Sequence, residues 1–371
     1  MIKKTFNKIK KFSNIKIRFD LPKSKEILLF DEIGALALRE IIKKDFSILK
    51  IPREIKLYQN ELEINFWIFL KQVIIFDFKF ITYCQNYIKF TSPKVVITFN
   101  DNYTHFYKLK EKLKTIHFIS IQNGVRLQSW FKSKELIESK NLECDHMFVF
   151  NKYILKKYKK YIKTNYHILG SFKNNMVQVN DTKIFNEFLF ISQFHKSNKK
   201  NQNYQTKVLN LIKKYLSGSN KKLHILLRNK DSFYQTEEIE YFKKIFQSNC
   251  VFHKTSKWEK SYKIMDRFEN IIFMFSTLGY EAISRKKKVA IFSPSKFQNY
   301  KNYFGWPARI QKDYSFFSIK KLTYNETERV LSNIYNCNQL NWEKKYYNVI
   351  KDQLLFNRDN IKLTRVIFNL L

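Results

Sequence analysis

The 371-residue sequence has few glycines and prolines, 6 and 5 respectively. Average usage would give a chain of this length about 26 glycines, so collagen-like and other glycine- or proline-rich architectures are excluded. Cysteine is scarce as well. None of the four cysteines forms a CxxC pair, and no histidines at zinc-ligand spacing accompany them. We therefore expect a reduced protein without a metal site.

Long apolar runs are also missing. No stretch reaches the ~18 uninterrupted apolar residues of a membrane-spanning helix. The most apolar segment, residues 66–83, contains Lys71, Gln72, Asp77 and Lys79, and it is expected to form a buried helix or a helix–strand junction. The basic N-terminus has no apolar segment behind it, so we expect no signal peptide. These absences favour a cytoplasmic protein.

Positive charge is abundant. Lys and Arg number 69 and Asp and Glu 32, which gives a net charge of +37. Such an excess suggests nucleic acid or an anionic membrane surface as a partner, but lysine is spread along the whole chain and AT-rich codon usage explains much of it. No nucleic-acid-binding motif is present, so a nucleic-acid-binding protein is the least favoured interpretation. The basic segment Lys3–Arg18 is expected to be either a solvated arm or a peripheral contact with the inner membrane.

Short apolar runs alternate with longer amphipathic stretches, which is the pattern of βαβ units and parallel sheets. The expected strands are residues 26–30, 46–51, 95–99, 117–121, 147–150, 167–169, 188–191, 223–227, 250–252, 271–275 and 289–292. The expected helices include residues 35–44, 62–83, 106–113, 205–216, 278–285, 324–335 and a wholly helical 342–371. The polar stretch 174–182 marks a boundary, so the sequence predicts an α/β fold with two similar Rossmann-like domains and a helical tail.

The few glycines are expected where the backbone needs them. Gly34, Gly124, Gly170 and Gly279 each follow a predicted strand. Ligands of open α/β sheets bind beyond the carboxyl ends of the strands, and the cleft between two such domains is the default site. We therefore predict that the functional site lies at these strand ends, between the two domains.

The strongest motif is IIFMFSTLGYEAISRKKKVAIF, residues 271–292. A predicted strand runs into Ser276 and Thr277, either of which can cap the helix that follows. The N-terminus of that helix would suit a phosphate, and Gly279 would let a diphosphate approach the backbone. Glu281 lies in the first turn, where its carboxylate could accept hydrogen bonds from both hydroxyls of a ribose. The alternative is an ordinary capped helix whose glutamate only complements the helix dipole.

A second motif, IHFISIQNGVR, places Gln122, Asn123, Gly124 and Arg126 after another predicted strand. Arginine is scarce here relative to lysine, so Arg126 indicates a planar, bidentate contact. The alternative is a plain βα turn, since Asn-Gly is common in turns.

Two further strand ends carry candidate general bases. Asn100 and Asp101 follow residues 95–99, and Asp101 could either accept a proton or cap the next helix. Asp31 and Glu32 end the first strand and are rival bases. The remaining polar residues at strand ends are Gly170 and Ser171 on the acceptor side, and Ser192, Gln193 and Arg228 on the donor side. Each of these is also explained as an ordinary loop residue, although Arg228 could neutralise a phosphate.

Six short motifs occur in order along the chain, namely FDEIGALAL, TFNDN, ISIQNGVR, ILGSFKNN, FISQF and STLGYEAISRKKKVAIFS. This series, closed by FNRDN, resembles surface-carbohydrate (lipopolysaccharide) biosynthesis proteins over residues 26–365. The STLGYEA block is also similar to blocks in capsule polysaccharide enzymes, CDP-glycerol glycerophosphotransferases and UDP-GlcNAc 2-epimerases. The resemblance implies a GT-B fold: an acceptor domain (1–175), a nucleotide-donor domain (183–340), and C-terminal helices (341–371) that pack back on the first domain.

By the same resemblance, the donor nucleotide would be held by Ser276, Thr277, Gly279 and Glu281. Asp101, Asn123 and Arg126 would lie across the cleft. One departure is residues 269–270, Glu-Asn, where relatives often carry an aspartate. The implied activity is that of a metal-independent glycosyltransferase, which moves a sugar from a nucleotide-sugar donor to a glycan or lipid-linked glycan and needs no other cofactor. The alternatives on the same fold are a glycerol- or ribitol-phosphate transferase and a sugar-nucleotide epimerase, which would need no acceptor.

Overall fold

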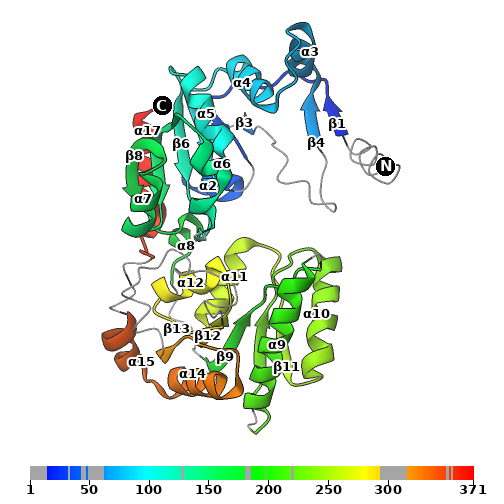
Figure 1. The fold of residues 1–371 in the computed structure, drawn as a ribbon, viewed down its shortest axis with the longest axis vertical. Helices are drawn as coiled ribbons and strands as arrows, with labels where there is room; N and C mark the ends of the chain where they lie inside the picture. Colours follow the sequence, from blue (N-terminus) through cyan, green and yellow to red (C-terminus); the bar gives the residue numbers. More distant parts are fainter. Residues whose placement is uncertain are drawn as a thin grey trace.

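Two parallel β-sheets, one in each half of the chain, form the framework of the protein (Figure 1). The structure, a computed structural model, describes residues 15–31, 34–42, 47–48, 62–126, 129–179, 185–196, 198–218, 221–292, 316–347, 351 and 354–371. The N-terminal sheet has six strands and the C-terminal sheet has five.

The N-terminal sheet has the strand order β3-β2-β5-β6-β7-β8. Its strands are β2 (Ile27–Leu29), β3 (Ser47–Ile48), β5 (Val95–Thr98), β6 (His117–Ile121), β7 (Leu142–Val149) and β8 (Ile162–Ile168). Successive side chains of a strand point to opposite faces. Val96 therefore packs with α4 (Phe80–Thr91) and α5 (Thr104–Lys112), whereas Val95 and Ile97 pack with α2 (Ala35–Ile42). Burial on both faces explains why these strands are continuous apolar runs in the sequence.

The C-terminal sheet has the strand order β11-β10-β9-β12-β13. Its strands are β9 (Phe185–Ile191), β10 (Leu223–Leu226), β11 (Cys250–His253), β12 (Phe268–Phe273) and β13 (Lys288–Ile291). The helices around it are α9 (Lys199–Leu216), α10 (Ser232–Phe246), α11 (Trp258–Asp266), α12 (Thr277–Ser284) and α14 (Tyr324–Asn336). Val208 of α9, Phe242 of α10 and Val330 of α14 are fully buried in the core that these elements share.

Both sheets contain a point where the order of strands reverses. From β2 the chain adds β3 on one side and β5 on the other, and from β9 it adds β10 and β11 on one side and β12 and β13 on the other. In open α/β sheets, ligands bind outside the carboxyl ends of the strands at such points. Asp31 and Asp101 follow β2 and β5, and Ser192 and Ser276 follow β9 and β12. The candidate residues therefore lie at the two topological switch points.

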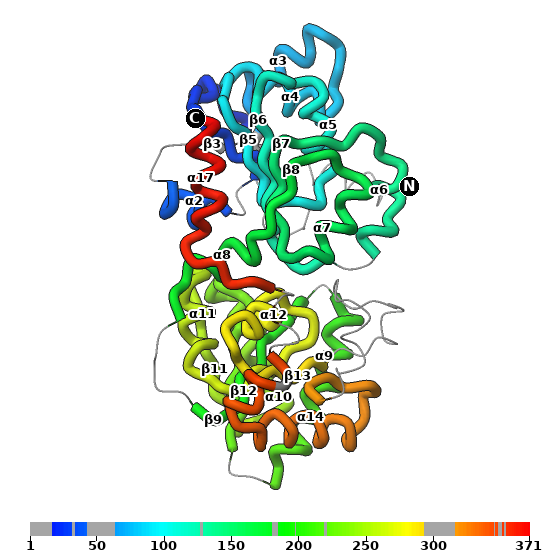
Figure 2. The backbone as a smooth tube through the Cα atoms, turned by 90° about the vertical axis from the view of Figure 1, so that its left-hand side faces the viewer, coloured from blue at the N-terminus to red at the C-terminus, as the bar shows by residue number. Residues whose placement is uncertain are grey.

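The end of the chain returns to the N-terminal half. α14 packs in the C-terminal core, whereas α17 (Ile361–Asn369) buries Leu363 and Ile367 in the N-terminal core (Figure 2). Between them, Asn357 N donates to Asn175 Oδ1 at 2.9 Å, and Asn175 Nδ2 donates to Asn360 Oδ1 at 2.9 Å. Asn175 belongs to α8 (Phe172–Met176), directly after the N-terminal sheet. The predicted crossing back of the C-terminal segment is confirmed.

The expected helix over residues 62–83 is wrong. This segment contains β4 (Leu62–Asn65), α3 (Phe66–Ile74) and the start of α4 (Phe80–Thr91). Residues 66–83 are therefore two helices joined by a turn, and neither the single buried helix nor the helix–strand junction expected there is correct. α3 begins where it does because the Asn65 side chain accepts hydrogen bonds from the N–H groups of Trp67 and Ile68. The sequence analysis also missed β1 (Ile15–Arg18), which pairs in parallel with β4. Of the basic segment Lys3–Arg18, residues 1–14 lie outside the described residues.

The tail is not wholly helical. Residues 354–357 are non-helical, and Asp359 has a φ of 60° within the turn Arg358–Asn360. The reason is that the chain must pass from one core to the other here. Asn360 fixes this passage, because its Nδ2 donates to the backbone oxygen of Phe172 at 2.9 Å. Of the expected strand 46–51, only β3 lies within the described residues.

Replacing Gly170 with alanine is expected to destabilise the protein by about 2 kcal/mol or more. Gly170 has a φ of +76°, and a Cβ there would lie 2.0 Å from the backbone oxygen of Leu355 in the crossing segment. Gly218→Ala is the matched control, since nothing lies within 4 Å of its added Cβ. Urea unfolding of both variants measures the free energy of unfolding, and equal stabilities would contradict this close crossing.

Candidate functional site

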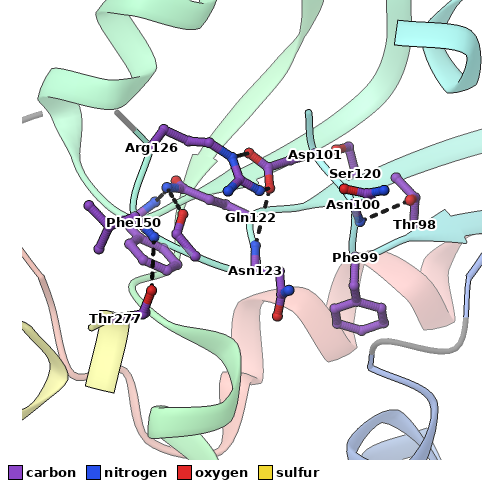
Figure 3. A network of polar contacts seen from close by, with 12 residues as sticks. Thr98, Phe99, Asn100, Asp101, Ser120, Gln122, Asn123, Arg126, Phe150 and Thr277 are labelled. Carbon is purple, nitrogen blue, oxygen red and sulfur yellow. Dashed lines mark hydrogen bonds and ion pairs between the residues drawn. The ribbon is translucent and has the colours of Figure 1, made fainter. Parts of the chain in front are cut away.

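The turn after β6 and the N-terminus of α12 are in contact across the junction of the two halves (Figure 3). Val125 N donates to Thr277 Oγ1 at 3.2 Å. Gly124 approaches the same hydroxyl so closely that an added Cβ would lie 3.3 Å from it. The two strongest sequence motifs therefore meet in space, although Val125 and Thr277 are 152 positions apart in the chain.

Arg126 is held in place by Asp101. Its Nε donates to Asp101 Oδ2 at 2.8 Å, and its Nη2 donates to Oδ1. Burial by itself lowers the pKa of Arg126, but the Asp101 carboxylate and Tyr158 raise it by more, so the net shift is upward and the guanidinium stays charged. The planar, bidentate contact expected of Arg126 is present, and its partner is a side chain of the same half of the molecule (Figure 3).

The prediction of Asp101 as an accessible general base is wrong for this geometry. Its side chain is 0% exposed. Besides Arg126, Tyr158 Oη donates to Oδ2 at 2.6 Å and Asn123 N donates to Oδ1 at 3.2 Å. A base must reach the proton that it abstracts. Asp101 does not cap α5 either, because the N-cap position belongs to Tyr103. Asp101 instead holds the strand-end loops together.

Asp31, the rival base, is also buried, with 5% exposure. Its Oδ2 accepts hydrogen bonds from Thr98 Oγ1 at 2.6 Å and from Phe99 N at 2.9 Å. These bonds join the end of β2 to the end of β5, so the prediction of Asp31 as an accessible base is wrong for the same reason. Glu32 lies outside the described residues.

Three amide side chains lie near Asp101, and they differ in burial: Gln122 is buried, whereas Asn100 and Asn123 are partly accessible to a ligand. Gln122 is buried; its Oε1 accepts from Phe150 N at 2.8 Å, and its Nε2 donates to the Gly124 oxygen at 2.9 Å. Asn100 and Asn123 are half-buried, and the Asn123 side chain points away from Asp101 (Figure 3). Gln122 therefore shapes the turn, while the two asparagines border the junction.

Ser276 occupies the N-cap position of α12 but makes no capping hydrogen bond with its side chain. Thr277 Oγ1 accepts from Val125 N instead of capping the helix. The expectation that one of them caps α12 is therefore wrong. Both residues are half-buried, and the first N–H groups of a helix have no acceptor within the helix. This end of α12 has the positive partial charge that favours an anion.

Gly279 is needed for packing. A Cβ at this position would lie 2.1 Å from the Phe273 ring of β12. That ring also packs edge-on against Tyr280, with centroids 5.0 Å apart. The glycine therefore lets α12 approach its own sheet, and the expected approach of a diphosphate to Gly279, which is buried, is wrong.

Glu281 joins the two halves of the molecule. Ser171 Oγ, just after β8, donates to its Oε1, and Tyr262 Oη donates to its Oε2 at 2.9 Å. Glu281 is 4% exposed, so the expectation that it faces an open mouth is wrong. Burial raises the pKa of Glu281 above its ordinary 4.5, and the hydrogen bonds from Ser171 and Tyr262 oppose that rise.

The remaining donor-side residues differ in exposure. Ser192 Oγ accepts from Phe194 N at 3.1 Å, and Gln193 Oε1 accepts from Phe275 N at 2.8 Å. Gln193 therefore ties the loop after β9 to the segment after β12, whereas Ser192 stabilises the loop itself. Arg228 is exposed, with one terminal nitrogen 3.4 Å from the Phe194 oxygen. Arg228 is therefore the member of this group that can meet an anion.

A buried cluster around Arg285 was missed by the sequence analysis. Arg285 pairs with Asp266, and its Nη1 donates to Asn174 Oδ1 at 3.2 Å and to the Val177 oxygen at 2.8 Å. Asn174 Nδ2 also donates to Ser284 Oγ at 2.8 Å. This cluster fixes the end of α12 to the segment that links the two sheets. The only signal in the sequence is an arginine at the head of a lysine run.

Neither a metal-ligand cluster nor a membrane-spanning helix is found among the residues that the structure describes. Within the described ranges, no group of three or more His, Cys, Asp or Glu side chains is placed to hold a metal ion. Among the helices of those ranges, none combines the length and the apolar character needed to cross a membrane.

Comparison with known proteins agrees with this architecture. The model of a family described as "putative O-antigen biosynthesis protein" matches residues 119–370. No curated protein sequence matches the chain. Among solved structures, the Methanocaldococcus jannaschii UDP-GlcNAc 2-epimerase in complex with UDP-GlcNAc and UDP has a TM-score of 0.55 at 12% identity, covering 92% of this chain and 99% of that one.

Two other solved structures are similar in the same way. S. aureus MnaA, solved with UDP, has a TM-score of 0.54 at 11% identity, covering 93% of this chain and 96% of that one. Sucrose-phosphate synthase from Thermosynechococcus elongatus has a TM-score of 0.50 at 8% identity, with coverages of 93% and 98%. At these identities the likeness shows the fold. The predicted GT-B architecture and the resemblance to surface-carbohydrate biosynthesis proteins are confirmed.

Asp101→Asn is expected to lower the free energy of unfolding by about 3 kcal/mol, because it leaves the Arg126 charge without its buried partner. Tyr158→Phe removes one hydrogen bond to the same carboxylate and should lower it by about 1.5 kcal/mol. The control is Asp20→Asn, at an exposed position. Urea unfolding measures the free energy of unfolding of the three variants, and the loss should be largest for Asp101→Asn, smaller for Tyr158→Phe and smallest for Asp20→Asn. If Asp101→Asn is as stable as the control, Asp101 does not hold the strand-end loops together.

The stability difference between the wild type and Glu281→Gln should depend on pH. The folded-state pKa of Glu281 is raised above the unfolded value of 4.5. The stabilising contribution of Glu281 is therefore fully present below the unfolded pKa and is lost as the pH rises through the folded pKa. Urea unfolding at several pH values should show the wild type gaining stability over the variant as the pH falls from neutral toward 4.5. A difference that stays constant over this window would show that burial does not disfavour the charged form.

Proposed function

The chain belongs to the O-antigen biosynthesis family whose model it matches, and we propose that it is a glycosyltransferase acting on a nucleotide-sugar donor. The sugar would pass to a glycan or lipid-linked glycan of the surface polysaccharide. The observation that carries this proposal is the contact between the Gly124–Arg126 turn and the N-terminus of α12. This contact lies at the carboxyl ends of both sheets, where open α/β folds bind their ligands.

The donor phosphates would bind between Arg126 and the first turn of α12. Asp101 holds the Arg126 guanidinium through two of its three nitrogens, Nε and Nη2. The third, Nη1, would lie 3.7 Å from a Cβ added at Gly124, which places it beside the turn that contacts Thr277. A fixed cation and a helix N-terminus are both suited to phosphate. As the bond to the sugar breaks, they would stabilise the charge that develops on the leaving nucleotide.

Acceptor activation does not involve Asp101 or Asp31 in this proposal, because both carboxylates are buried and hydrogen-bonded. Asp101 is a positioning residue, since it acts on the ligand only through Arg126. Arg228, exposed after β10, is placed to add a second positive charge on the donor side.

A sugar-nucleotide epimerase is the second candidate. It is supported by the similarity of the fold to that of the Methanocaldococcus jannaschii UDP-GlcNAc 2-epimerase, which covers 92% of this chain. The two activities differ in what they consume. NMR can distinguish them. Nucleotide sugars that carry the nucleotide selected by the thermal-unfolding test below are incubated with the protein alone and with an extracted glycolipid acceptor. Conversion without acceptor identifies the epimerase, and release of the nucleotide only with acceptor identifies the transferase.

Thermal unfolding in the presence of CMP, CDP, UDP, GDP or dTDP tests the donor site. One nucleotide is expected to stabilise the protein by about 2.7 kcal/mol at ~100 times its Kd. Arg228→Ala should reduce this stabilisation, whereas the matched variant Arg39→Ala, on the exposed side of α2, should leave it unchanged. If no nucleotide shifts the unfolding temperature of the wild type, the proposed donor site is wrong.

Ser171→Ala is expected to tighten nucleotide binding by roughly tenfold. The Ser171 hydroxyl donates to Glu281 Oε1, one of the two carboxylate oxygens that the motif analysis expects to accept hydrogen bonds from the ribose. Removing the serine hydroxyl removes this competition, and Glu281→Gln should weaken binding instead. Isothermal titration with the nucleotide selected above measures both. Unchanged affinity in both variants would leave Glu281 a purely structural residue.

A further inference from the structure

A group of large apolar side chains is exposed on α3 and the turn that follows it. We define the α3 face as Trp67, Phe69, Leu70, Ile74, Phe76 and Phe78. Phe76 is 86% exposed, Ile74 69% and Phe78 60%. α3 lies at the end of the N-terminal half farthest from the C-terminal half, beside β1 and β4 (Figure 1). Contiguous exposed apolar side chains of this kind mark an interaction surface.

The polarity of α3 is largely the reverse of that of an ordinary surface helix, which turns its apolar side inward. Its two buried residues are Ile68 and Gln72. Gln72 Nε2 donates to the backbone oxygens of Asp77 at 2.9 Å and Lys79 at 3.0 Å. An amide therefore takes one of the inward positions, while aromatic and aliphatic side chains face solvent. Core packing within the described residues does not account for the α3 face.

The turn after α3 is built so that Phe76 points outward. Phe76 has a φ of 51°, a conformation that is costly for an aromatic residue. Asp77 stabilises this turn, because its Oδ2 accepts from Thr82 Oγ1 at 2.8 Å and its Oδ1 accepts from Lys79 N at 3.1 Å. Strained backbone conformations are often associated with function. The strain at the exposed Phe76 therefore indicates that its side chain contacts another molecule.

The charge around the α3 face is positive. Arg18, Lys71 and Lys79 are exposed on β1, α3 and the turn after α3, and Asp20, next to the N-cap Asn65, is an exposed carboxylate among them. The nearby Asp77 carboxylate is engaged by Thr82 and Lys79. With a net charge of +37, two copies of the chain repel each other, whereas the negative surface of an anionic bilayer attracts the protein. Charge therefore favours lipid over a second copy as the occupant.

We propose that the α3 face docks on the surface of an anionic phospholipid bilayer, with Ile74 and Phe76 inserted among the lipid headgroups and upper acyl chains. α3 has nine residues, so it is about 14 Å long, too short to cross a hydrocarbon core of ~30 Å. It lies in the plane of the interface, with Trp67 at headgroup level and Lys71 and Lys79 near the phosphates.

This surface is distinct from the basic N-terminal segment considered from the sequence. The described part of that segment is β1, whose Ile15–Arg18 backbone pairs with β4 and so supports α3 from beneath. Docking goes beyond the proposed function and does not depend on it. If the protein uses a lipid-linked acceptor, docking would bring it to the surface that holds this substrate.

Co-sedimentation of the full chain with lipid vesicles tests the proposal. We expect binding to vesicles of phosphatidylglycerol mixed with phosphatidylcholine, and much weaker binding to phosphatidylcholine alone. The double variant Ile74→Ser/Phe76→Ser should lose about tenfold or more in affinity for the anionic vesicles, because it removes the inserted apolar area. The matched control is Phe233→Ser/Leu340→Ser, which changes two equally exposed apolar residues in the C-terminal half and should bind as the wild type does.

Two controls distinguish docking from misfolding of the variants and from dimerisation. Thermal unfolding of both double variants should match the wild type, and the nucleotide stabilisation described above should be retained in both, so that failure of docking and failure of the donor site are distinguishable. Equal loss of vesicle binding in the two double variants, or no loss in either, would overturn the proposal. So would a wild-type dimer, seen by light scattering, that only Ile74→Ser/Phe76→Ser dissociates while vesicle binding persists.

The fluorescence of Trp67 measures independently how deeply the α3 face inserts into the bilayer. Vesicles whose acyl chains carry bromine should quench the fluorescence of the wild type and should quench Trp67→Phe much less. Trp67 is 44% exposed, and its indole Nε1 donates to the Phe19 oxygen at 2.6 Å, which keeps it at the edge of the α3 face. Quenching that is the same with and without Trp67 would show that another part of the protein contacts the lipid.

Discussion

The Asp101 carboxylate accepts four hydrogen bonds, from Arg126, Tyr158 and the backbone of Asn123, and it reaches no solvent. A buried charge of this kind is strongly destabilising unless every partner is in place. Because Asp101 follows β5, its hydrogen bonds fix the turn after β6 and the end of α7 (Lys152–Tyr158) relative to β5. Val125, which contacts Thr277, lies within that turn. The geometry of the candidate site on the N-terminal side follows from this one group.

The junction of the two halves also contains several buried polar contacts. Ser171 and Glu281, and Asn174 and Ser284, pair across it, and Arg285 reaches back to the segment that links the sheets. Interfaces between domains that move relative to each other are more polar than permanent ones. Exchangeable hydrogen bonds at Glu281 would allow a ligand to replace a protein partner without exposing apolar surface.

The sequence was sufficient for the fold but not for the roles of its strand-end residues. Alternating apolar runs predict the strands because parallel strands are buried on both faces, and strand ends gather at one edge of a sheet. Accessibility is different, since it depends on partners far along the chain. Asp101 is closed off by Tyr158, 57 positions away, and Glu281 by Ser171, 110 positions away. No local pattern contains that information. Periodicity likewise could not show that α3 turns its apolar side outward.

The two passages of the chain between the halves lie side by side. The first leaves through α8 and the second returns through residues 354–360, and Asn175 is hydrogen-bonded to Asn357 and Asn360 of the second. Two covalent links at one place act as a single pivot. Any change in the angle between the halves would therefore be centred on these asparagines. The contact between Val125 and Thr277 would open only if the buried bonds of Glu281 and Arg285 across the junction also changed.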